Sequence, residues 1–340
     1  MLKLNIINEI PDGLLELSSS KDLQQIFEQP TLLHLQGSNK KPLFISVLLH
    51  ANEDTGFIAV QKLLKKYQNK TLPRSISIFF GNIAATKKGV RRLKGQPDYN
   101  RIWPGGNHPE CDETRLIQQV ADEMALLEPF ASIDIHNNTG KNPHYGCINS
   151  VDDEFIHLAA LFSHIIVFFE TPKGVQSMAM AKLCPSVTLE CGQPQQAHGV
   201  EHATDYLDTV LHLNDIKHTP LNRHNYEVFQ TVARVTVPEN CTFSFSKHQA
   251  DILFEPELDK LNFSKLAEGT VFGEINNADK ACLEVWDDHE QAVSNSYFKN
   301  HDNKIVLSKA IMPAMLTLDE KIIRQDCLCY LMKRLELENG

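Results

Sequence analysis

The stretch Leu43–Gly56, LFISVLLHANEDTG, is an apolar run that ends in a histidine, a glutamate three residues later and a group of turn residues. Such a run is typical of a strand buried in an α/β sheet, and the helical spacing of apolar residues from Phe57 to Tyr67 predicts a helix after it. In open α/β sheets, ligands bind at the carboxyl ends of the strands. His50 and Glu53 therefore stand where a functional site is expected.

Spacing alone does not identify a site at His50 and Glu53. The same His-x-x-Glu pattern also begins at His198 and at His224. A surface pair of this kind would cap the following helix, because the N-terminus of a helix favours a carboxylate. Further residues are needed to decide between a helix cap and a site.

The rest of the sequence predicts an α/β fold with a mixed, mostly parallel sheet flanked by helices, because strand-like and helix-like segments alternate. Strands are expected at 31–37, 43–50, 75–82, 132–136, 165–170 and 185–192, and helices at 57–67, 113–127 after an N-cap at Asp112, 152–164 and 202–213. Past Pro220 the pattern changes to short β-like runs between turns. We therefore expect an α/β domain at 1–218 and a smaller β-rich domain at 219–340.

The composition excludes several classes of protein. The chain has 340 residues, 42% of them hydrophobic, and a net charge of -10, which argues against a nucleic-acid partner. Its apolar stretches are too short to span a bilayer, and the start, MLKLNIINEIPDG, lacks the apolar segment of a signal peptide, so we expect a cytoplasmic protein. The eight cysteines are scattered, and no pair has zinc-knuckle spacing. Any metal site is therefore expected to use His and Glu.

Two further strands end in candidate groups, His136 after SIDI and Glu190 after SVTL. A catalytic zinc ion takes three protein ligands, often two histidines and one glutamate, plus water. Taken singly, His136 is more often a hydrogen-bonded histidine, and Glu190 could form a salt bridge at a strand end. Four such residues at three strand ends are hard to explain as caps. The sequence therefore favours a metal site that includes His50, Glu53 and His136.

A rival motif is HGVEH, residues 198–202, which matches the H-x-x-E-H pattern of two zinc-binding histidines and a basic glutamate. That chemistry needs a stable helix, so that the two histidines share one face. Gly199 follows the first histidine, and the segment GQPQQA precedes it. We therefore expect His198 at or before the start of a helix, as a helix entry rather than the metal site.

Five motifs occur in an order that resembles the succinylglutamate desuccinylase and aspartoacylase family, which is related to zinc carboxypeptidases. They are HANE, GNIAATKKGVRR, DYNRIWPGG, DIHNNTG and TLECG, within residues 43–215. The β-rich remainder fits the smaller C-terminal domain of that family in kind. The resemblance implies a zinc carboxypeptidase-like fold that holds one Zn²⁺ per chain through His50, Glu53 and His136, with Glu190 as the general base.

The resemblance also implies roles in substrate binding. Arg91 takes the place of the arginine that polarises the substrate carbonyl, with Arg92 as the alternative because the loop after it is longer than usual. Asn100 and Arg101 match the family's D-x-N-R motif, in which they bind the substrate carboxylate. Asn137 resembles an aspartoacylase position that lines the pocket.

Some positions depart from the family pattern. HAN replaces the commoner HGN, Tyr99 stands where leucine or methionine is usual, the proline after Asn82 is missing, and NPHYGC fits neither named enzyme. Arg101 has an alternative interpretation as a buried ion pair with Asp98. The departures leave the expected metal site intact and leave the substrate open.

The expected function is zinc-dependent hydrolysis of a linear amide bond in a small N-acyl amino acid or related carboxylated amide. One alternative is a carboxypeptidase-like peptidase that acts on a peptide end. Another is a zinc-binding protein that recognises a ligand without hydrolysing it, although such a protein has no need of Glu190 as a base. The expected partner is a small carboxylated amide substrate, and we expect neither a nucleic-acid partner nor a membrane. The sequence does not decide whether the protein forms a homo-oligomer.

Overall fold

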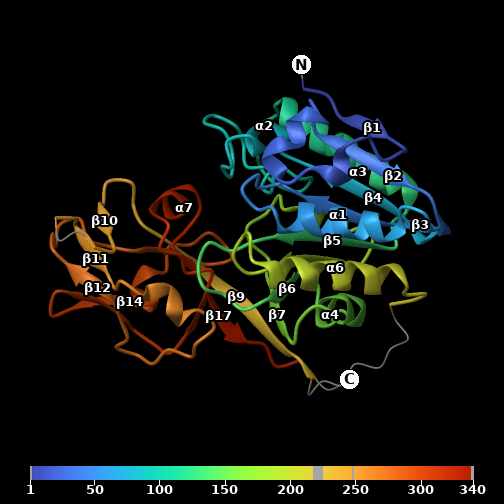
Figure 1. Cartoon of the computed structure of the whole chain (residues 1–340). Helices are drawn as coiled ribbons and strands as arrows, with labels where there is room; N and C mark the ends of the chain where they lie inside the picture. Colours follow the sequence, from blue (N-terminus) through green and yellow to red (C-terminus); the bar gives the residue numbers. More distant parts are fainter. Residues whose placement is uncertain (1, 217–224, 247–248, 338–340) are drawn as a thin grey trace. The chain divides into compact units, whose positions relative to one another are not determined.

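A computed structural model describes residues 2–216, 225–246 and 249–337 (Figure 1). The chain forms two compact units. The first contains Met1–Asn137 and His144–Glu227, and the second contains Asn138–Pro143 and Val228–Gly340. The domain boundary predicted between 218 and 219 lies outside the described residues.

The first unit is built on a mixed sheet with the strand order β1-β2-β4-β3-β5-β8-β6-β7. Its strands are β1 (Asn5–Ile7), β2 (Thr31–Leu35), β3 (Gly37–Val47), β4 (Leu72–Phe80), β5 (Ala131–His136), β6 (Tyr145–Ile148), β7 (Ile165–Phe168) and β8 (Ser186–Glu190). Pairing is parallel except between β2 and β4 and between β6 and β8. The predicted mixed, mostly parallel sheet is confirmed.

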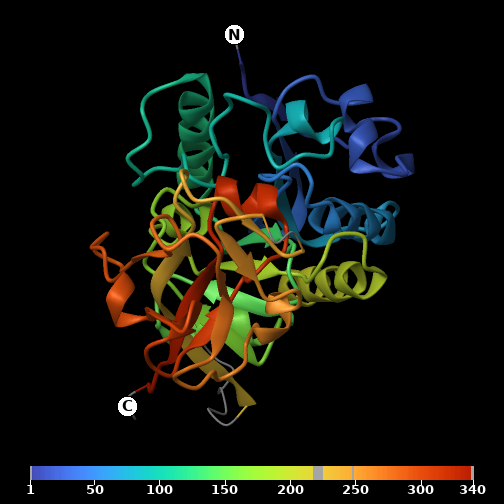
Figure 2. The ribbon, with the colours of Figure 1, turned by 90° about the vertical axis from the view of Figure 1, so that its left-hand side faces the viewer.

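Helices cover both faces of this sheet. They are α1 (Thr55–Tyr67), α2 (Ile83–Thr86), α3 (Asp112–Leu127), α4 (Asp153–Ala160), α5 (Gln176–Met180) and α6 (Ala197–Leu211), with 3₁₀ turns η1 (Leu14–Glu16) and η2 (Ser20–Gln25). Figure 2 shows α1 and α6 side by side, with α3 well apart from them. Apolar residues of α3 and α5 share one buried cluster with Phe44 and Phe79 of the sheet.

The loop after β3 brings two of the predicted site residues to the edge of the sheet. β3 ends at Val47, so the prediction that this strand runs to His50 was wrong. Leu48 adopts φ 59°, which ends the extended conformation before the histidine. Gly56 in α1 lies so close to the sheet that a Cβ atom there would stand 2.9 Å from side-chain atoms of Val47 and of Ile135. This contact fixes the start of α1 directly against β3 and β5.

The second unit is β-rich, as predicted. One group of strands has the order β9-β17-β16, with β13 paired to β9, and a second sheet has the order β10-β11-β12-β15-β14. The elements are β9 (Glu227–Thr236), β10 (Phe243–Ser244), β11 (Ile252–Phe254), η4 (Leu258–Leu261), β12 (Val271–Ile275), β13 (Glu284–Trp286), η5 (Ser294–Ser296), β14 (Phe298–His301), β15 (Lys304–Leu307), β16 (Met312–Ala314), α7 (Glu320–Gln325) and β17 (Cys329–Arg334). None of the helices in the described ranges combines the length and the apolar sequence that a membrane crossing requires.

Candidate metal centre

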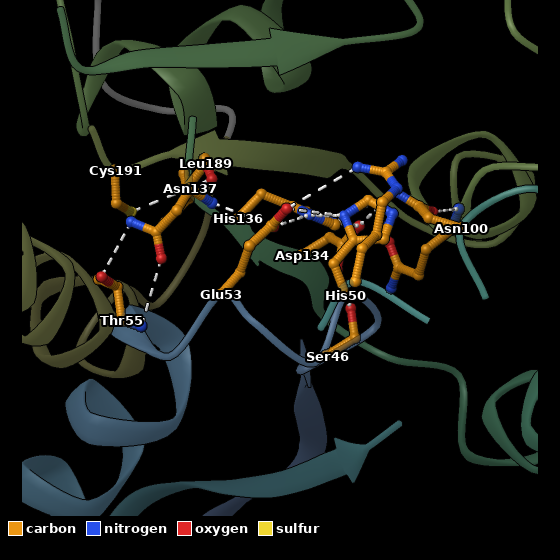
Figure 3. Close-up of polar contacts among 12 residues, drawn as sticks. Ser46, His50, Glu53, Thr55, Asn100, Asp134, His136, Asn137, Leu189 and Cys191 are labelled. Carbon is orange, nitrogen blue, oxygen red and sulfur yellow. Dashed lines mark hydrogen bonds and ion pairs between the residues drawn. The ribbon is translucent and has the colours of Figure 1, made fainter. Parts of the chain in front are cut away.

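Three of the predicted side chains converge at the carboxyl edge of the first unit's sheet. His50 and Glu53 lie in the loop between β3 and α1, and His136 is the last residue of β5. One ligand atom from each residue can be chosen so that all lie within 4.8 Å of one another, and all three residues are buried. Figure 3 shows the three side chains pointing toward one another.

The hydrogen bonds around the two imidazole rings suit a cation. Nε2 of His50 lies 3.0 Å from a carboxylate oxygen of Asp98, and Nε2 of His136 lies 2.8 Å from one of Asp134. An ionised carboxylate only accepts hydrogen bonds, so each Nε2 donates to its aspartate, and loss of the proton on Nδ1 would leave that nitrogen's lone pair for a cation. The two Nδ1 atoms are 3.2 Å apart and face Glu53 at 2.9 and 2.7 Å. Such a group of acceptors fits a metal ion.

The electrostatics agree with this donor set. Burial alone would raise the pKa of Glu53, but the charges and hydrogen bonds of His50 and His136 outweigh it, so the pKa falls below its usual range. Burial alone would lower the pKa of His136, but Asp134 and Glu53 raise it well above its ordinary value. Glu53 is therefore ionised, and the His136 ring lies between two negatively charged carboxylates, those of Asp134 and Glu53. A bound cation would replace the proton between them.

Glu190 ends β8, where it pairs in register with His136 of β5 and Tyr145 of β6. Its side chain is buried, and burial, together with the charges of Glu53 and Asp134, raises its pKa to about 8. The neighbouring His136 and Arg91 act in the opposite direction. A carboxyl group with a raised pKa beside a cation-binding group is suited to exchange protons near neutral pH.

Of the two candidate arginines, the structure brings Arg91 to the cluster. Its guanidinium bonds a carboxylate oxygen of Asp98 at 2.9 and 2.8 Å, and Nη1 lies 3.9 Å from Glu53. Arg92 instead donates to the backbone oxygen of Gln96 at 3.1 Å. Burial would raise the pKa of Asp98, but the charges of His50 and Arg91 lower it well below the usual range. Asp98 thus contacts both His50, a candidate metal ligand, and Arg91, the candidate group for binding the substrate carbonyl.

The three remaining predicted residues have different surroundings. Arg101 is half-buried, and its Nη1 donates to the backbone oxygen of Asn100 at 2.8 Å. The amide of Asn100 is buried behind His136, with Nδ2 lying 3.1 Å from the ring's Nε2. Asn137 is buried too; its amide bonds Thr55 and the backbone oxygen of Gly192, and its backbone N–H donates to Glu53 at 3.1 Å.

The rival motif HGVEH lies within α6, which begins at Ala197, so the prediction that His198 stands at or before the helix start was wrong by one residue. The rings of His198 and His202 each lie 5.2 Å from that of His144, and Nε2 of His202 bonds the backbone oxygen of Phe162 at 2.6 Å. These nitrogens do not converge as ligands. Within 2–216, 225–246 and 249–337, the search for clustered His, Cys, Asp and Glu finds only the group around His50.

Two supporting residues were missed by the sequence reasoning. Asp134 binds His136, and Ser46 donates to Asp134 at 2.6 Å. A signal for Asp134 was present, because a charged residue two positions before a strand-end histidine shares its face of the strand. Ser46 had no such signal, since a serine in an apolar run has many explanations.

The sequence profile of the succinylglutamate desuccinylase/aspartoacylase catalytic domain matches residues 39–216, more than half of the chain. No curated protein matches the sequence. The match includes every predicted site residue and most of the first unit.

Solved structures give the same fold at low identity. Murine aminoacylase 3 superposes with a TM-score of 0.60 at 14% identity, over 88% of this chain and 96% of its own. Succinylglutamate desuccinylase from Vibrio parahaemolyticus gives 0.60 at 12%, over 94% and 96%. The desuccinylase from Chromobacterium violaceum gives 0.56 at 14%, over 88% and 87%. At these identities the likeness establishes the fold alone.

Proposed function

Because the chain belongs to the succinylglutamate desuccinylase/aspartoacylase family, we propose that it is a zinc-dependent amidohydrolase that cleaves a small N-acyl amino acid or related carboxylated amide. The observation that carries the proposal is the convergence of His50, Glu53 and His136. The placement of Glu190 and Arg91 around this group adds the acid–base and oxyanion functions that hydrolysis needs.

The metal would be held by Nδ1 of His50, Nδ1 of His136 and the carboxylate of Glu53. Two imidazoles, one carboxylate and an open position are the ligand set of catalytic zinc. A zinc ion bound there supplies a Lewis acid that polarises a carbonyl group and lowers the pKa of water. Because the protein's own ligands carry only one negative charge, the centre keeps a net positive charge.

The protein's own groups then have separate tasks. Glu190 accepts a proton from the attacking water and returns it to the leaving amine. Its raised pKa of about 8 belongs to the metal-free site, and a nearby cation favours the carboxylate form that accepts a proton. Arg91 donates to the carbonyl oxygen as negative charge develops, which is worth about 3 kcal/mol for one oxyanion donor.

Substrate orientation is assigned to Arg101. A guanidinium can hold a carboxylate with two parallel hydrogen bonds and so fix the scissile bond near the metal. Arg101 is only half-buried, in contrast to Arg91 and Asn100, and so remains accessible to a small molecule. Asn137 is proposed as a pocket residue beside the third ligand.

The test compares the parent protein with Glu190→Gln, both loaded with zinc, on N-succinyl, N-acetyl and dipeptide substrates. We expect turnover of at least one N-acyl amino acid, and a fall in kcat of about 100-fold or more in the variant at unchanged zinc content. Glutamine keeps the shape of the side chain but cannot accept the proton. Equal rates for parent and variant would remove Glu190 as the base, and turnover of the dipeptide alone would make the protein a peptidase.

A further inference from the structure

Two loops of the first unit meet beside the proposed carboxylate-binding residue. The loop between α2 and α3 carries Arg101, and the other loop connects β7 to α5. The backbone N–H of Trp103 donates to the backbone oxygen of Gly174 at 2.9 Å. The backbone N–H of Gln176, the first residue of α5, donates to the side-chain oxygen of Asn100 at 2.9 Å. Hydrogen bonds on both sides of Arg101 therefore join the two loops.

Gly174 lies so close to Arg101 that no side chain fits between them. A Cβ atom on Gly174 would stand 2.3 Å from the backbone oxygen of Arg101 and 2.8 Å from its carbonyl carbon. Gly106 adds to this contact from the loop that carries Arg101, because a Cβ atom on Gly106 would stand 2.8 Å from Cα of Gly174. Gly174 also has φ 73°, a conformation that favours glycine. The close approach of the two backbones therefore depends on glycine.

The hydrophobic core holds the other side of the same segment. Trp103 is 1% exposed, and its ring centroid lies 6.4 Å from that of Phe44 and 6.1 Å from that of Phe79. The backbone N–H of Arg101 donates to the backbone oxygen of Asp98 at 2.9 Å. The main chain at Arg101 is thus fixed between the core and Gly174. Its side chain is only half-buried, so a small molecule can reach it.

We propose that Gly174 is a positioning residue for substrate binding, which fixes the backbone of Arg101 and so the point from which the guanidinium reaches the substrate carboxylate. The inference rests on the proposed function, because it takes Arg101 as the carboxylate-binding residue. A bidentate pair of guanidinium and carboxylate needs two aligned hydrogen bonds, so a small shift of the arginine's backbone weakens it. The loop between β7 and α5 thereby sets the affinity for the carboxylate through Arg101.

The experiment measures by calorimetry how tightly the zinc-loaded protein binds glutarate, a dicarboxylate, in the parent, in Gly174→Ala and in Arg101→Ala. We expect Gly174→Ala to weaken glutarate binding about 10-fold, the effect of impairing a charged hydrogen bond, at unchanged zinc affinity. In the Arg101→Ala background the same replacement should weaken binding by no more than about two-fold, because the residue through which it acts is missing. An equal loss with and without Arg101, or parental affinity in Gly174→Ala, would overturn the proposal.

The matched control is Gly105→Ala. Gly105 has φ 99°, so alanine there brings the same kind of backbone strain. Its Cβ atom would meet Nζ of Lys182 at 3.4 Å, the end of a flexible side chain that can move away. We expect parental glutarate affinity for this variant. A loss as large as that of Gly174→Ala would make backbone strain the cause in place of the contact with Arg101, and the proposal would fall.

Gly106→Ala supplies a second, milder variant if Gly174→Ala does not fold. Its added methyl group would press on Gly174 and should weaken glutarate binding in the same direction, while parental affinity here would contradict the inference. Steady-state kinetics on the preferred substrate adds another readout, in which Gly174→Ala should raise KM and leave kcat within about three-fold of the parent. Glutarate binding requires no hydrolysis, so failure to turn over any amide would count against the proposed function and not against this assignment.

Discussion

Arg91 and Arg92 are adjacent in sequence but have different surroundings. Arg91 is held by Asp98 and lies 3.9 Å from Glu53, whereas Arg92 bonds the backbone of its own loop. Replacing Arg91 with glutamine should therefore lower kcat by about 100-fold to 1,000-fold, the typical loss of one oxyanion donor. Steady-state kinetics on the preferred substrate would measure this effect.

The matched control is Arg92→Gln, for which we expect a change in kcat of no more than a few-fold. Zinc content must be measured in both variants, since Asp98 links Arg91 to His50. If the larger loss belongs to Arg92→Gln, the assignment of the two arginines is reversed.

At the residue scale, the sequence was sufficient to find the candidate ligands but not their surroundings. His50, His136 and Glu190 were recognisable because each is a polar residue that follows an apolar strand, and this depends only on local sequence. Their hydrogen-bond partners lie far away along the chain, as Asp98 does from His50 and Ser46 from Asp134. Such pairings arise from strand order and register, which local patterns do not specify.

At the scale of elements, long apolar runs and helical periodicity were predictive, and short or polar elements were not. Strand β5 and helix α3 lie where the sequence places them, although the helix is capped by Cys111 and not by Asp112. Strand β6 was missed because its four residues, YGCI, are too few to show a period. β4 starts at Leu72, before the predicted start at Ser75. The prediction missed the first residues of this strand because they include a charged residue, an arginine that is buried in the structure.

That arginine, Arg74, joins separate elements through backbone carbonyls. It is 1% exposed, donates to the oxygens of Lys41 and Leu213 at 2.9 and 2.8 Å, and stacks 3.6 Å from the ring centroid of Phe130. Burial lowers its pKa. Arg74→Ala would remove the hydrogen bonds to these two carbonyls and leave a cavity at a buried position, so we expect a loss of about 3 kcal/mol in the free energy of unfolding.

Urea denaturation would measure the loss in Arg74→Ala, with the exposed Lys62→Ala as the matched control. Lys62 lies on α1 and should change stability by less than about 0.5 kcal/mol. Zinc affinity should be unchanged in both variants, because neither residue contacts the metal cluster. An Arg74→Ala protein as stable as the control would show that the carbonyl bonds contribute nothing net.

At the scale of the whole molecule, all three candidate ligands belong to the first unit, so metal binding should stabilise that unit. The chain's two tryptophans lie one in each unit, Trp103 in the first and Trp286 in the second. In a Trp286→Phe protein, tryptophan fluorescence therefore reports the unfolding of the first unit alone. Trp103 is 1% exposed and packs against Phe44 and Phe79, so its emission should change strongly on unfolding.

Zinc at about 100 times its dissociation constant should add about 2.7 kcal/mol to the stability of the folded state, because the ion binds the native cluster and not the unfolded chain. For a unit of this size the Tm reported by Trp103 should rise by about 5–10 °C, and a chelator should reverse the rise. His50→Ala in the same background should abolish the shift, since it removes one ligand and leaves the sheet intact. A zinc-dependent rise that persists in His50→Ala would place the stabilising ion elsewhere in the molecule and remove the cluster of His50, Glu53 and His136 as the metal centre.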